Sequence, residues 1–123
     1  DEEQVWVAAG IGVTPFIAWL EGLQDRPEQA PVASLHYCAN NEQDAVFADR
    51  LQQLCEKLPS IRLHVHLSQR DGKLDSNQLL AGRDGNTKVW FCGPEGFADS
   101  IAQAMNQLGM NPHNLHREFF RMR

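Results

Sequence analysis

The chain has 123 residues, of which 42% are hydrophobic, and a formal net charge of −5 at pH 7. This length suits one domain with its own core and is too short for two of ordinary size. The acidic balance argues against a general affinity for nucleic acid or for an anionic membrane surface, because both reward an excess of Lys and Arg. We therefore expect one domain over residues 1–123, in which any anionic ligand is held by local groups.

Residues 5–9 (VWVAA) are predicted to form the first strand. The run is wholly apolar, which is typical of a strand covered on both faces in a parallel sheet. It leads directly into GIGVTP at residues 10–15. Two glycines between a strand and a helix let backbone N–H groups approach a diphosphate, and the helix dipole favours its charge. A plain strand-to-helix turn is the alternative, because Gly-x-Gly-x-x-Pro lacks the third glycine of the common dinucleotide fingerprint.

The first helix is predicted to follow this loop. Thr14 is placed to cap it, Pro15 suits its first turn, and Gly22 and Pro27 mark its end. Its apolar side chains recur at helical spacing, at Phe16, Ile17, Leu20 and Leu23.

Two strands and a second amphipathic helix are predicted in the middle of the chain. Residues 32–38 form a mixed strand. Residues 61–68 alternate between apolar and polar side chains, which indicates a half-exposed strand at the sheet edge. Between these strands, one helical face carries Phe47, Leu51, Leu54, Cys55 and Leu58. A loop is expected after residue 68.

The last part of the chain repeats the alternation of strand and helix. Residues 89–92 are a second continuous apolar run, predicted to be central, and residues 115–119 a short last strand. The helix between them has its apolar face at Phe97, Ile101, Ala104, Met105 and Leu108. This order predicts an α/β, Rossmann-like, open parallel five-stranded sheet of order 3-2-1-4-5 with helices on both faces. Ligands of such sheets bind where GIGVTP and CGPEG (residues 92–96) would converge.

Several segments together resemble a known family. In order, the chain carries AAGIGVTPFIAWLE, LHYCANNEQDAVFADRLQQL, LSQRDGKLDSNQL, VWFCGPEGFADSIAQAMNQLGM and HREFF. These segments are similar to the NAD(P)H-binding domain of the ferredoxin–NADP reductase superfamily, and within it to bacterial membrane ferric reductases and their NADPH-oxidase relatives. The glycine loop, the Cys-Gly-Pro after a central strand and the Glu-x-Phe-like end are jointly specific, whereas any one of them alone is weak.

The resemblance implies a site that holds a nicotinamide dinucleotide against a flavin. It assigns the diphosphate and the nicotinamide ribose to Gly10, Gly12, Val13, Thr14 and Pro15. It assigns the nicotinamide to Cys92, Gly93, Pro94 and the adjoining Glu95, with Cys92 helping to place the ring for hydride transfer. It also implies a carboxylate near the hydride path at Glu118 and an aromatic ring near the flavin at Phe119 or Phe120. Cys92 and Glu118 are thus the candidate catalytic residues.

The 2′-phosphate distinguishes NADPH from NADH. After the third strand, Ser68, Arg70 and Lys73 provide a hydroxyl and two cations at the carboxyl edge of the sheet, which suit a phosphate. Asn40, after the second strand, is a weaker candidate, because related reductases often carry Arg nearby. We favour NADPH over NADH but keep both open, since Arg70 and Lys73 also suit a solvated loop.

Other reactive side chains have plainer interpretations. At a helix N-terminus Cys92 would be a nucleophile with a lowered pKa, but a packing or ring-positioning role is favoured. Cys38 and Cys55 are expected to be small core residues. His64 and His66 share a strand face without a third ligand, so we expect solvated edge histidines and no metal site.

The sequence therefore predicts the NAD(P)H-binding domain of a flavin-dependent, ferric-reductase-like oxidoreductase. The start just before a strand suggests a piece of a longer chain, with an upstream FAD-binding barrel and a haem-bearing transmembrane domain as partners. The domain would lie on the cytoplasmic side of the inner (plasma) membrane and would catalyse little alone. A non-catalytic nucleotide-sensing domain is one alternative. A flavodoxin-like or receiver domain is another, and the glycine in place of an acid after the first strand counts against it.

Overall fold

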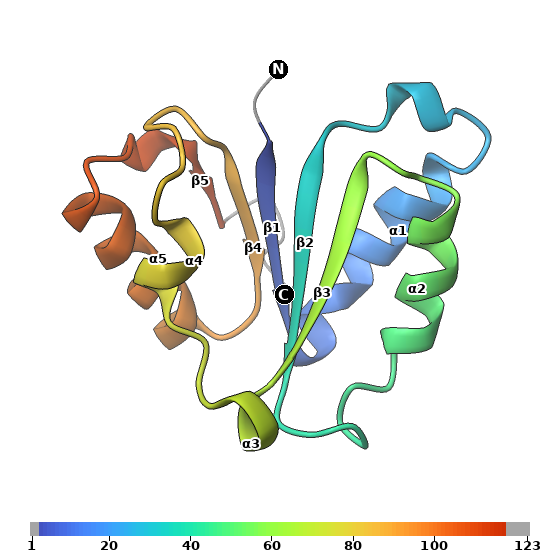
Figure 1. Cartoon of the computed structure of the whole chain (residues 1–123), viewed down its shortest axis with the longest axis horizontal. Coiled ribbons are helices and arrows are strands. Elements are labelled where there is room, and N and C mark those ends of the chain that lie inside the picture. The colour runs from blue at the N-terminus through green and yellow to red at the C-terminus, as the bar shows by residue number, and fades with distance from the viewer. Residues whose placement is uncertain (1–2, 118–123) are drawn as a thin grey trace.

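Five strands form one parallel sheet in the computed structural model, which describes residues 3–117. The strands are β1 (Gln4–Ala9), β2 (Ala33–Ala39), β3 (Ile61–Leu67), β4 (Val89–Cys92) and β5 (Leu115–His116). Their order is β3-β2-β1-β4-β5, and all adjacent pairs are parallel. The predicted Rossmann-like α/β fold and its strand order are confirmed, and β1 and β4 lie side by side inside the sheet (Figure 1).

Helices cover both faces of the sheet (Figure 1). The helices are α1 (Thr14–Gly22), α2 (Ala48–Glu56), α3 (Ser68–Asp71), α4 (Ser76–Leu80) and α5 (Glu95–Gln107), and the 3-10 turns are η1 (Gly10–Val13), η2 (Pro27–Gln29) and η3 (Pro112–Asn114). One face carries α1 and α2, and the other carries α4 and α5. No helix within residues 3–117 is both long enough and apolar enough to cross a bilayer.

The continuous apolar run of β1 serves two separate cores. Trp6 packs under α1 with ring centroids 5.7 Å from Phe16 and 5.2 Å from Trp19. Val5 and Val7 point to the opposite face, where they join the core beneath α4 and α5. Because successive side chains of a strand alternate between faces, a strand covered on both sides must be apolar at every position.

The face of β2 and β3 on the α4 and α5 side is polar. β3 buries its apolar positions against α2 and turns Arg62, His64 and His66 to the other face. This confirms the predicted half-exposed edge strand. On β2 the same face carries Ser34 and His36, which are nonetheless only 2% and 6% exposed.

Three local predictions were wrong. The expected loop after residue 68 contains α3 and α4, and α4 is capped because the Asp75 carboxylate accepts from the Asn77 N–H. Thr14 does not cap α1, because η1 precedes the helix and the Thr14 hydroxyl donates instead to the Ile11 carbonyl at 3.3 Å. Leu108 follows the end of α5 and is 41% exposed, since the chain turns before that side chain reaches the core.

Candidate functional site

The two glycine-containing loops meet at the carboxyl ends of β1 and β4. The strands pair in parallel with Ala8 opposite Cys92, so the loops that follow them leave the sheet together. A Cβ on Gly12 would overlap the Cys92 carbonyl oxygen and lie 2.6 Å from its carbon. The predicted convergence is confirmed, and it requires a residue without a side chain at position 12.

Two neighbouring glycines meet different requirements. Gly10 has φ +59°, and a Cβ there would meet nothing within 4 Å, so the residue is needed for its left-handed backbone. Gly93 is needed for space, because a Cβ there would lie 2.9 Å from the Cβ of Ala9 and 3.0 Å from Cζ of Phe91. Together these glycines let the loops turn tightly and leave their backbone open.

A crevice of about 1660 Å³ runs along this edge of the sheet. Nine of the predicted site residues line it, from the segments at the carboxyl ends of four strands, β1 to β4: Gly10, Gly12, Asn40, Ser68, Lys73, Cys92, Gly93, Pro94 and Glu95. The sheet topology thus gathers segments that are far apart in the sequence at one opening.

Other predicted site residues lie elsewhere. Val13 is fully buried in the core, while Thr14 and Pro15 begin α1 and do not line the crevice. Arg70 is absent from the lining as well, and its guanidinium donates two hydrogen bonds of 2.7 Å to the carboxylate of Asp71. The predictions for Glu118, Phe119 and Phe120 fall outside the described residues.

A polar pair ties the ends of β2 and β3 at one end of the crevice. The Ser68 hydroxyl donates to Oδ1 of Asn40 at 3.2 Å, and the Gln69 N–H donates to the Asn40 carbonyl at 2.9 Å. Lys73 lines the same crevice from the segment after α3. This end therefore offers a hydroxyl, an amide and an ammonium group, which suit an anionic ligand.

The Cys92 thiol does not have the character of a nucleophile. It is 4% exposed, and burial raises its pKa above the ordinary value. A reactive cysteine needs the opposite shift, because the thiolate is the attacking species. Its burial and raised pKa count against the nucleophilic interpretation, and the favoured packing or ring-positioning role stays a prediction. Burial likewise raises the pKa of Cys38 to about 12 and that of Cys55 to about 11, and both residues are partly buried.

Of the two histidines that were predicted to be solvated, His64 is exposed, whereas His66 is half-buried and contacts His36. Nε2 of His66 lies 2.9 Å from Nδ1 of His36, and the His36 and His64 rings stack with centroids 4.7 Å apart. Burial, followed by the neighbouring His64 and His66, lowers the pKa of His36 to about 3. Burial also lowers the pKa of His66. Among residues 3–117 no group of these side chains is arranged to hold a metal ion.

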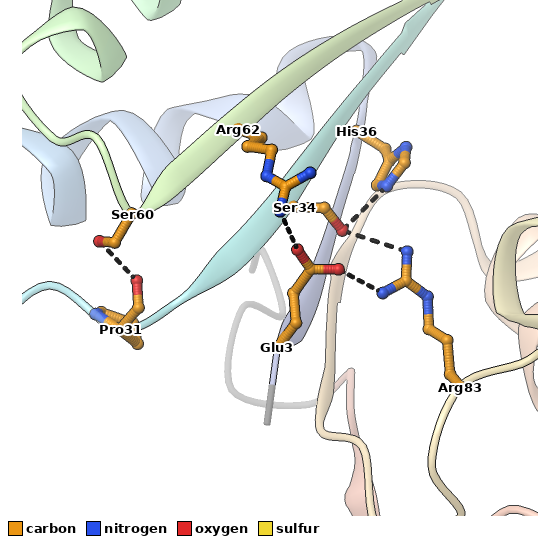
Figure 2. A network of polar contacts seen from close by, with 7 residues as sticks. All are labelled: Glu3, Pro31, Ser34, His36, Ser60, Arg62 and Arg83. Carbon is orange, nitrogen blue, oxygen red and sulfur yellow. Dashed lines mark hydrogen bonds and ion pairs between the residues drawn. The ribbon is translucent and has the colours of Figure 1, made fainter. Parts of the chain in front are cut away.

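A network of polar side chains continues from His36 toward the start of β1 (Figure 2). His36 Nε2 lies 3.1 Å from the Ser34 hydroxyl, to which Arg83 donates at 3.4 Å. Arg83 also donates to the Glu3 carboxylate at 2.6 Å, and Arg62 reaches the same carboxylate at 4.0 Å. The buried side chains of Ser34 and His36 on β2 thus both have partners.

Sequence reasoning missed several residues of the crevice. His66 lines the crevice two residues before Ser68. The alternation of β3 places both residues on the same face of the strand, but this pattern was interpreted only as exposure to solvent. Arg117 also lines it and donates to Asp99 at 3.1 Å, a contact that no spacing in the sequence predicts. Ile11, at the tip of the glycine loop, is 74% exposed beside the opening.

Comparison with known proteins adds a family match. The model of the oxidoreductase NAD-binding domain matches residues 6–103. The chain is 31% identical over 119 residues to the vanillate O-demethylase oxidoreductase of Pseudomonas sp. (strain HR199 / DSM 7063), covering 97% of this chain and 36% of the relative. It is 30% identical to the carnitine monooxygenase reductase subunit of Escherichia coli (strain K12), covering 96% and 35%. It is 33% identical to the heme-dependent oxidative N-demethylase beta subunit of Ectopseudomonas mendocina (strain ymp), covering 97% and 36%.

Solved structures share the fold. A flavohemoglobin from Malassezia yamatoensis with bound FAD and heme superposes with a TM-score of 0.81 at 21% identity, covering 96% of this chain and 31% of that one. The cytochrome P450 reductase GcoB from Amycolatopsis gives a TM-score of 0.73 at 20% identity, covering 95% and 37%. The chain spans about a third of the length of the curated relatives described above.

Proposed function

The chain belongs to the oxidoreductase NAD-binding domains of the ferredoxin–NADP reductase superfamily, and from this we propose that it binds NAD(P)H in the crevice and presents the nicotinamide to a flavin on another domain. The observation that carries the proposal is the meeting of two glycine loops, in which Gly12 lies against the Cys92 carbonyl at the edge of a large opening. Ligands of open parallel sheets bind at this position.

The proposed roles follow the placement of the two loops. The diphosphate and the adjoining ribose contact the loop of Gly10 and Gly12, where a tight turn exposes backbone N–H groups to an anion. Val13, Thr14 and Pro15 contribute by fixing the start of α1 behind that loop. The nicotinamide lies beside the second loop, where the residues that line the crevice are Cys92, Gly93, Pro94 and Glu95.

The chemistry needs little from side chains of this domain. A flavin supplies an acceptor for hydride and releases electrons singly, so the protein contributes position and electrostatics. The buried, neutral Cys92 thiol forms an apolar wall for the nicotinamide. Glu118 and one of Phe119 and Phe120 are proposed to complete the site next to the flavin.

We propose NADPH as the preferred dinucleotide, with NADH as the alternative. Lys73 and the amide N–H groups of Asn40 offer donors to a 2′-phosphate at one end of the crevice, and the Ser68 hydroxyl can join them by turning its proton away from Oδ1 of Asn40. Arg70 is a weaker contributor, because its guanidinium must first leave the carboxylate of Asp71.

Calorimetric titration with NADP⁺ and NAD⁺ tests the binding proposal. We expect Lys73→Ala to weaken NADP⁺ about tenfold, by losing one charged contact to phosphate, and to change NAD⁺ little. Arg70→Ala is the matched control on the same segment, and we expect a smaller loss. Failure of both dinucleotides to bind the full-length protein would overturn the proposal.

We further propose that the electrons pass from the flavin to an iron centre. The sequence resemblance supports a ferric reductase with haem in the membrane, its dinucleotide domain on the cytoplasmic side. The names of the relatives support a second candidate, the reductase component of an oxygenase or demethylase. Flavin reduction by NAD(P)H, followed by reoxidation with ferric chelate or with a separately purified oxygenase, distinguishes the two. Dinucleotide binding without flavin reduction would instead support a nucleotide-sensing domain.

A further inference from the structure

One imidazole belongs both to the crevice and to the buried polar network. The His66 side chain lines the crevice, as do Ser68 and Lys73. On its other side, Nε2 of His66 lies 2.9 Å from Nδ1 of His36, a side chain that is 6% exposed. A ligand group beside Ser68 therefore lies near His66. The protonation state of His66 depends on its hydrogen bond with the buried imidazole of His36.

The buried imidazole can support either protonation state of its partner. Arg83 is donor-only, so the Ser34 hydroxyl accepts from it and still has its own proton to place. A neutral His36 can donate to His66 while accepting from Ser34, or accept from His66 while donating to Ser34. The second arrangement fits a protonated His66. Neither state leaves a nitrogen of His36 without a partner.

When the pair of imidazoles takes up a proton, the positive charge lies on His66, which lines the crevice. Burial and two neighbouring imidazoles keep His36 neutral, with a pKa lowered to about 3. His66 is more exposed, and although burial and the neighbouring His64 also lower its pKa, the nearby Asp71 acts in the opposite direction. The titratable and charged groups that surround it are His36 on β2, His64 on β3, Arg70 and Asp71 on α3, and Asp44 and Lys73 in the crevice wall.

We propose that His66 is a specificity-determining contact for the 2′-phosphate of NADP(H), and that this contact strengthens when the imidazole is protonated. The inference rests on the proposed function. A phosphate beside Ser68 and Lys73 would gain one further charge-assisted hydrogen bond from a cationic His66. By linkage, the bound phosphate favours protonation of His66 to the same extent.

The preference between dinucleotides at different pH tests this contact. In the full-length protein, the ratio of the NAD⁺ Kd to the NADP⁺ Kd should rise about three- to tenfold between roughly pH 7.5 and 5.5. The 2′-phosphate itself titrates at about pH 6. The ratio of Kd values at each pH is therefore compared with the ratio for a His66→Gln variant. We expect the variant to lose most of the rise. His113→Gln is the control, since His113 is exposed on η3 and does not line the crevice.

A measurement on the unmodified protein removes any dependence on how the variant folds. NMR titration of the His66 imidazole should show a pKa raised by NADP⁺ and raised much less by NAD⁺. An equal pH dependence in wild type and His66→Gln, or no difference between the two dinucleotides in the imidazole titration, overturns the inference. NAD⁺ binding that persists in these cases leaves the proposed function standing. Absence of binding by either dinucleotide would remove both.

Discussion

Gly12 lies where two loops touch, so a single methyl group tests the site. In Gly12→Ala the new Cβ would overlap the Cys92 carbonyl, and the loops would have to separate. We expect a loss of about 1–3 kcal/mol in the free energy of unfolding, typical of overpacking, measured by urea denaturation. Dinucleotide affinity should fall at least about tenfold, because a shift of one loop moves its N–H donors.

Gly22 is a matched control for that substitution. It is the last residue of α1, and a Cβ there meets nothing within 4 Å. Gly22→Ala should raise the free energy of unfolding by about 0.5–1 kcal/mol and leave dinucleotide affinity unchanged. If Gly12→Ala is as stable as wild type, the contact with Cys92 is not a constraint.

His36 gives the stability of the protein a dependence on pH. The folded state holds it neutral, with a pKa of about 3, whereas the unfolded chain takes up the proton near 6.5. Below pH 6.5 the unfolded state binds more protons, so stability falls as pH falls and this contribution levels off near pH 3. The slope from this residue is at most about 1.4 kcal/mol per pH unit.

A variant isolates that slope from the effect of the carboxylates. Urea denaturation of wild type and His36→Gln across this range should give a smaller acid destabilisation in the variant. Parallel curves would show that the buried imidazole is not the source. The sequence did not predict this behaviour, because His36 lies in a mixed strand, and its burial depends on the Ser34 and Arg83 contacts brought together by tertiary folding.

The strands and long helices were predictable because each carries its pattern over several residues. The apolar runs of β1 and β4, and the alternation of β3, reflect burial directly. α4 has only five residues, too few for a repeat, and its stability comes from packing of Leu79 and Leu80 against α5. The two glycine loops of the site were likewise predictable, whereas the pairing of Arg70 with its neighbour Asp71 depends on a turn that no pattern specifies.

The N-cap of α4 should contribute measurably to the stability of the protein, although the helix has only five residues. Asp75→Ala removes the acceptor for the Asn77 N–H, and we expect a loss of about 1 kcal/mol in the free energy of unfolding. Thermal denaturation should show a lower Tm for this variant. Asp25→Ala, at an exposed position between α1 and η2, is the control and should change Tm little. Equal Tm values in the two variants would mean that packing alone holds α4.

The net charge of the chain acts against the anionic ligand that we propose for its crevice. The net charge of −5 opposes an anionic dinucleotide, while Lys73 provides a local cation. At physiological ionic strength, salt screens interactions between exposed charges that lie more than about 8 Å apart. We expect NADP⁺ affinity to fall more steeply than NAD⁺ affinity as salt rises, measured by calorimetry at several salt concentrations. Equal slopes for the two dinucleotides would contradict a cationic phosphate contact.

The parallel sheet also sets the order in which the crevice can assemble. During synthesis β1, β2 and β3 emerge first, and one edge of β1 has no partner until β4 arrives. Cys92 ends β4, so the two walls of the crevice meet only when that strand docks. Non-local parallel pairing is slow to form. The onset of dinucleotide binding during refolding therefore marks the docking of β4, and a nascent chain that stalls before this strand presents the apolar edge of β1 to chaperones or to other chains.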